Sequence, residues 1–174
     1  MVALLRGINV GGSGKLPMAQ LREIVSGCGH DDVRTYIQSG NVVFTTSARS
    51  TAKVARELQD AIAASSTVKP AVIVRTRSEL AAIVAANPFL ARGEDAAHQH
   101  VVFLPDGTGA VDVPTSSPEG EAAEPGRAVV YLHLPHGVGR SKFASNVVAA
   151  CGPVTTMRNW RTVTKLLSMA DELA

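Results

Sequence analysis

The sequence has few aromatic residues, only two cysteines and no long apolar run, and each shortage narrows the class of protein. Aromatic residues make up 4% of the 174 positions, so the interior has to be built mainly from Ala, Val, Leu and Ile. Cys28 and Cys151 lack the spacing of a metal site or a disulfide framework, which predicts two reduced thiols. No stretch approaches the ~18 apolar residues of a membrane span or contains the core of a signal peptide. We therefore expect a cytoplasmic protein that has no membrane association.

The charged residues are unevenly distributed along the chain. The net charge of +2 is too small to indicate nucleic-acid binding by itself. Residues 136–165 contain five Lys or Arg residues and no carboxylate, whereas residues 91–127 contain seven carboxylates and two arginines. The first stretch is expected to face an anionic ligand, and the second is expected to be solvated.

Hydrophobic periodicity predicts alternating strands and helices. In the first half, helices that begin at Pro17 and Thr51 separate strands over residues 2–8, 33–37, 41–45 and 71–75, in the order β-α-β-β-α-β. The second half has predicted strands over residues 98–104, 121–124, 128–134 and 154–158, with a hairpin turn across 125–127. We expect an α+β fold of two ferredoxin-like halves, residues 1–76 and 77–174, in one compact unit. Each antiparallel sheet should carry its helices on one face.

A glycine-rich loop with a nearby lysine occurs once in each half, over residues 5–15 and 135–142. Glycine-rich turns can point backbone N–H groups into a cavity, and a neighbouring cation gives that cavity a preference for anions. We therefore predict that the loops bind an anionic small molecule, such as a nucleotide or a phosphorylated metabolite. Whether they form one site or two is open.

The predicted topology brings other polar residues to each loop. In the first half the loop and the central hairpin should lie at the same end of the sheet, and in the second half the loop should approach the end of the last strand. The candidate ligand-binding residues are therefore Arg6, Asn9, Lys15, Gln38, Ser39, Asn41, Arg140, Ser141, Lys142, Arg158 and Asn159. Ser141 and Asn159 also suit the N-caps of the helices that follow them.

Standard cofactor and metal motifs do not fit these loops. A P-loop would need glycine where Asn9 stands and a hydroxyl where Leu16 stands. His98 and His100 alternate along one strand, but no third metal ligand lies nearby in the sequence. We expect no cofactor and no metal.

Two other functions remain open, and no catalytic residue can be assigned. The basic stretch 136–165 could bind nucleic acid weakly, without the interleaved aromatic residues of a base-stacking sheet. Alternatively, Ser39 or Ser141 could be the nucleophile of an enzyme, with His136 as the nearby candidate base.

Five segments, taken in order, resemble the signatures of a known family. The N-terminal pair reads LLRGINVGG at 4–12 and TYIQSGNVVF at 35–44, and the later ones are NPF at 87–89, GVGRSK at 137–142 and TMRNWRTV at 156–163. The chain resembles the domain of unknown function 1697 family over essentially its whole length. This resemblance implies a two-layer α+β fold of two ferredoxin-like halves. It implies no activity, because the family has no established one.

Overall fold

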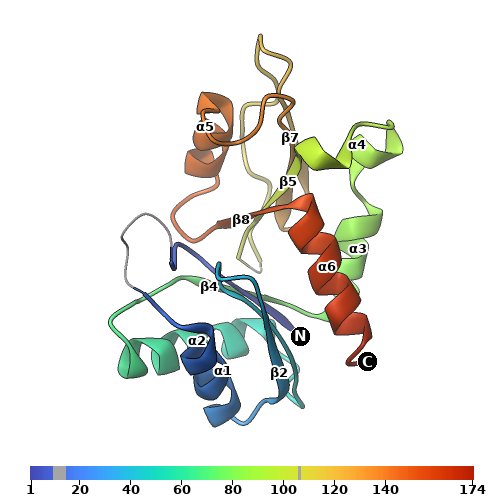
Figure 1. Cartoon of the computed structure of the whole chain (residues 1–174). Coiled ribbons are helices and arrows are strands. Elements are labelled where there is room, and N and C mark those ends of the chain that lie inside the picture. Colours follow the sequence, from blue (N-terminus) through green and yellow to red (C-terminus); the bar gives the residue numbers. More distant parts are fainter. Residues whose placement is uncertain (10–14, 106) are drawn as a thin grey trace. The chain divides into compact units, whose positions relative to one another are not determined.

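A computed structural model describes residues 1–9, 15–105 and 107–174, and the chain divides into two compact units (Figure 1). Unit 1 consists of Met1–Glu79 and Leu166–Ala174, and unit 2 consists of Leu80–Lys165. Within the described residues, each unit contains one four-stranded antiparallel sheet. The predicted α+β class is therefore confirmed.

Unit 1 has the predicted order of elements. They are β1 (Val2–Leu5), α1 (Met18–Gly27), β2 (Asp31–Tyr36), β3 (Asn41–Thr45), α2 (Thr51–Ser65) and β4 (Val72–Arg75). The strands lie in the order β2-β3-β1-β4, and each neighbouring pair is antiparallel. Pro17 is the N-cap of α1 rather than its first residue.

The core of unit 1 lies between the sheet and its two helices, which lie side by side on one face (Figure 1). Alternate strand residues point to this face because successive side chains of a strand point to opposite sides. The buried contributors from strands and helices are Ala3, Leu5, Val42, Phe44, Val72, Val74, Leu21, Val25, Val54, Leu58 and Ile62. Burial of each large aliphatic side chain contributes roughly 1.5–3 kcal/mol, so this layer fixes the ends of the strands that carry the loops.

Unit 2 repeats the strand order of unit 1. Its elements are α3 (Arg77–Ala85, which begins in unit 1), α4 (Pro88–Ala91), a 3-10 turn (Ala96–His98), β5 (Gln99–Phe103), β6 (Ala122–Gly126), β7 (Val129–His133), α5 (Lys142–Ala150), β8 (Thr156–Asn159) and α6 (Trp160–Asp171, which ends in unit 1). The strands lie in the order β6-β7-β5-β8. Where unit 1 has α1, unit 2 has residues 104–121, whose described part contains no helix.

Helix α5 packs on one face of the unit 2 sheet. Its Phe143, Ala144 and Val147 join a buried cluster with Val102 and Leu132. On β7, the Tyr131 hydroxyl donates a hydrogen bond of 2.8 Å to the Ile83 carbonyl of α3, and burial raises the pKa of this tyrosine to about 12. The contact fastens α3 to the face of the sheet opposite α5, because Tyr131 alternates with Leu132 along β7, so the prediction that helices cover only one face is wrong for unit 2.

The turn of the second hairpin differs from the prediction. Pro125 pairs with Val130 and Gly126 pairs with Val129, so the turn consists of residues 127 and 128 rather than 125–127. Ala128 has a φ of 56°, in the left-handed region that a tight hairpin turn requires. Proline is tolerated within β6 because this strand lies at the edge of the sheet.

Local capping residues fix the helix boundaries. Glu79 Oε2 accepts from the Thr76 backbone N–H at 2.8 Å, and the Glu79 N–H donates to Thr76 Oγ1 at 3.1 Å. This reciprocal pair is a capping box at the start of α3. None of the described helices is both long enough and apolar enough to cross a membrane.

Candidate functional site

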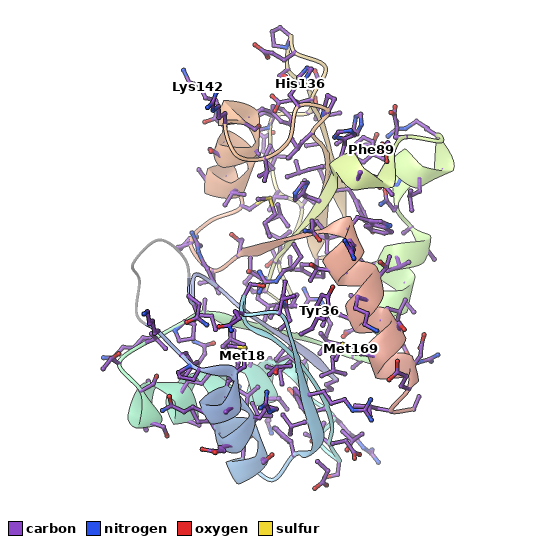
Figure 2. The ribbon with its side chains drawn as sticks, viewed as in Figure 1. Met18, Tyr36, Phe89, His136, Lys142 and Met169 are labelled. Carbon is purple, nitrogen blue, oxygen red and sulfur yellow. The ribbon has the colours of Figure 1, made fainter. Side chains whose placement is uncertain are left out.

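A pocket of about 620 Å³ lies beside the second glycine-rich loop, within unit 2. One wall comes from residues 114–121, which precede β6, and the other comes from residues 136–146, at the end of the loop and the start of α5. Figure 2 shows His136 on the loop and Lys142 at the start of the helix. A smaller hollow of about 370 Å³ shares Arg140, Ser141 and Lys142 with this pocket. The predicted loop therefore borders a cavity large enough for a small molecule.

The basic wall combines exposed cations with a helix N-terminus. Arg140 and Lys142 both line the pocket, and neither forms an ion pair with any described carboxylate. Ser141 is the N-cap of α5, and its Oγ accepts a hydrogen bond of 2.8 Å from the Ala144 backbone N–H. The first N–H groups of a helix have no partner within it and carry a partial positive charge. This wall therefore favours an anion.

The opposite wall holds a buried carboxylate, Glu121, which is 8% exposed and lines the pocket. One carboxylate oxygen accepts from the Ser117 hydroxyl at 3.0 Å, and the other accepts from the Ser141 hydroxyl at 2.5 Å. The Ser117 backbone N–H also donates to the Glu121 carbonyl at 2.9 Å. The bond to Ser141 joins the two walls of the pocket, and the two bonds with Ser117 hold Glu121 in its own wall.

Glu121 and Ser117 were not among the candidates from the sequence. They lie in or beside a segment rich in Pro, Gly, Ser and Thr that carries no hydrophobic period. The bond between Glu121 and Ser141 spans 20 residues of sequence, and no local pattern signals such a pairing. Only the high density of carboxylates before β6 could have drawn attention to the region.

The first glycine-rich loop is only partly described, because Gly11, Gly12 and Gly14 lie outside the described residues. Asn9, with a φ of 56°, donates from Nδ2 to the carbonyls of Leu16 (2.9 Å) and Gln38 (3.0 Å). Its Oδ1 also accepts from the Leu16 N–H at 2.9 Å. The Asn9 amide therefore ties the two sides of the loop to each other and to the β2–β3 hairpin.

The hairpin contacts agree with the predicted arrangement of unit 1. The Leu5 N–H donates to the Gly40 carbonyl at 2.8 Å, so β1 ends against the hairpin. Asn41 has no exposed surface, and its Nδ2 donates to Tyr36 O and to Ser39 Oγ, each at 3.0 Å. These polar side chains hold the backbone in place. The other candidates in this unit are exposed: Arg6, Lys15 and Gln38.

Arg158 and Asn159 lie on β8, which β5 separates from β7. In the sheet register, Asn159 lies opposite His100 and His133 lies opposite Gln99. The C-terminal ends of β7 and β8 therefore lie at the same end of the sheet, beside the start of β5. Arg158 is buried and donates to Thr156 Oγ1 (2.6 Å) and Met157 O (2.9 Å), and this burial lowers its pKa to about 10. Asn159 accepts from the Thr162 N–H as the cap of α6. Neither lines the pocket beside α5.

Replacing Asn9 by alanine should lower the free energy of unfolding by about 1–3 kcal/mol, because three hydrogen bonds are lost and alanine disfavours the left-handed region. Gln38→Ala is the control, since Gln38 takes part through its carbonyl, which alanine keeps. That control should change stability by less than about 0.5 kcal/mol. Denaturant unfolding measures both, and equal losses would contradict the role assigned to the Asn9 amide.

Together, the fold and the pocket define an α+β protein with a charged cavity next to a helix N-terminus. The chain belongs to the family described as protein of unknown function DUF1697, whose model matches residues 1–131. Among solved structures, it is similar to conserved bacterial protein SP0830 from Streptococcus pneumoniae, with a TM-score of 0.73 and 24% sequence identity over 97% of each chain. This likeness shows the fold. A search of curated proteins found no match.

Proposed function

We propose that the pocket of unit 2 binds an anionic small molecule, such as a nucleotide or a phosphorylated metabolite. The observation that supports this function best is the position of Arg140 and Lys142. Both are exposed at the pocket, and neither forms an ion pair with any described residue. A cation that has no internal partner can bind a ligand anion without breaking an existing ion pair.

The chemistry of this wall suits a phosphate group in particular. A guanidinium can donate two parallel hydrogen bonds to phosphate oxygens, and an ammonium supplies a compact charge. The N-terminus of α5 adds backbone donors and a partial positive charge at the same place. Gly137, with a φ of +81°, lets the chain turn sharply between β7 and these cations.

The shared strand order also supports the finer fold proposal of two ferredoxin-like halves. In both units the third strand pairs with the first and second, and the fourth pairs with the first. In this arrangement the loop after the third strand leads directly into a helix, which is the position of the glycine-rich loop in unit 2. The loop is therefore anchored at the end of a rigid strand, β7, and binding residues are commonly found on such loops.

Calorimetric titration with propyl phosphate tests this function. We expect binding with a Kd of about 1 mM or tighter at low ionic strength, which corresponds to about 4 kcal/mol or more. Because the contacts are charged and exposed, the affinity should fall as salt is added. Absence of any binding heat at low salt, together with unchanged amide spectra, would contradict the proposal.

A further inference from the structure

The two walls of the unit 2 pocket carry charges of opposite sign. Arg140 and Lys142 lie on the wall formed by the loop and α5, whereas Glu119 and Glu121 lie on the wall that precedes β6. No ion pair joins these four groups in the described structure. A simple anion would be attracted to one wall and repelled by the other.

On the acidic wall, Glu121 is the group that could bind a positively charged part of a ligand. It is buried, yet the contacts described for it are two serine hydroxyls and no cation. A carboxylate has about four lone-pair sites, so two hydroxyl donors leave further acceptor capacity. A buried carboxylate that has no cationic partner is costly, and a positively charged group in the pocket would offset that cost.

The hydrogen-bond chain through Ser141 fixes the distance between the Glu121 carboxylate and the first turn of α5, the two groups that a ligand with opposite charges would contact. Glu121 Oε1 accepts from Ser141 Oγ, and the same oxygen atom of Ser141 accepts from the Ala144 N–H. The carboxylate is therefore only two hydrogen bonds, or roughly 6 Å, from the first turn of α5. A ligand that contacts both must carry its opposite charges on a short spacer.

We propose that the ligand is a phosphate monoester that also carries an amine a few bonds from the phosphate. Its phosphate lies against Arg140, Lys142 and the first turn of α5, and its ammonium group donates to Glu121. This inference rests on the proposed function and narrows the class of ligand. The alternative is that Glu121 serves only as an internal counter-charge to the basic wall, in which case an amine gives no advantage.

O-phosphoethanolamine and propyl phosphate form a matched pair of probes, because an ammonium group in one replaces a methyl group in the other. Calorimetry should compare both compounds with the wild-type chain, with Glu121→Gln and with Glu119→Gln. Glutamine at 121 keeps one acceptor for a serine hydroxyl and removes the negative charge. Glu119 is an exposed carboxylate of the same wall, so its variant controls for a general change of charge.

We expect the wild-type chain to bind O-phosphoethanolamine about tenfold more tightly than propyl phosphate. E121Q should abolish this preference and bind propyl phosphate at least as tightly as the wild type, whereas E119Q should retain the preference. Equal affinities in the wild type would overturn the amine assignment and leave the phosphate site intact. A preference that persists in E121Q would overturn the role of Glu121, and failure of both probes would overturn the proposed function as well. If E121Q does not fold, the wild-type comparison alone decides between an amine preference and none.

Discussion

Replacing Gly40 by alanine should lower the free energy of unfolding of unit 1 by about 3 kcal/mol or more. Gly40 has a φ of +76°, where alanine is disfavoured, and its added Cβ would lie 2.7 Å from Leu5 Cβ. Two carbons of Ile8 would be only 3.0 Å away. Leu5 and Ile8 are both buried, and the Leu5 N–H is bonded to the Gly40 carbonyl, so neither neighbour can move freely.

Gly7→Ala provides the control for this prediction. Gly7 also has a positive φ, +66°, but nothing lies within 4 Å of its added Cβ. This variant should therefore lose only the conformational preference, about 1 kcal/mol. Guanidinium unfolding followed by circular dichroism measures both losses. Equal losses for the two variants would show that the close contact at Gly40 has no energetic weight.

The double substitution Arg140→Gln/Lys142→Gln should weaken the binding of propyl phosphate by about 20-fold or more, because two charge-assisted contacts are removed. Both side chains are exposed and make no described ion pair, so the thermal stability of the chain should change little. Calorimetry gives the affinity, and thermal unfolding checks that the fold is intact.

Arg161→Gln/Lys165→Gln is a matched control for the pocket. These two exposed cations belong to the same basic stretch and the same net charge is removed, but they lie on α6 and do not line the pocket. Their loss should leave the affinity for propyl phosphate within about twofold, a free-energy difference of about 0.4 kcal/mol. If both double variants weakened binding equally, general electrostatic attraction by residues 136–165 would explain the binding better than a defined site. A nucleic-acid interaction would then become the stronger interpretation.

The elements of the fold could be predicted wherever a local pattern dictates local structure. The apolar period and the N-cap Ser50 place the start of α2 at Thr51, the residue predicted from the sequence. The reciprocal bonds of Thr76 and Glu79 likewise follow from residues three apart. In the second hairpin, Pro125 and Gly126 suggested a turn, but pairing with β7 takes both into the edge strand. Tertiary pairing there overrides the local preference.

Only one wall of the candidate site could be predicted from the sequence, because the other wall depends on tertiary contacts. The basic loop at 135–142 is contiguous, so its glycines and cations can be identified together. The contact between Glu121 and Ser141 depends on tertiary structure, because β6 pairs with β7 and residues 115–117 bond back to the start of β6, as in the bond from the Ala123 N–H to the Thr115 carbonyl. Asn9 was predicted to bind a ligand, and its three hydrogen bonds to backbone groups of Leu16 and Gln38 could not be predicted from local sequence.

The most direct measurement of the central claim is a titration of the isotope-labelled chain with propyl phosphate, followed through its backbone amide NMR signals. We expect the largest shift changes at Gly137, Gly139, Lys142 and Phe143, in and beside the loop that precedes α5. Amides of the other glycine-rich segment, such as Gly7 and Lys15, should change little. Shifts confined to that first segment, or no shifts at all, would contradict the assignment of the binding site to unit 2.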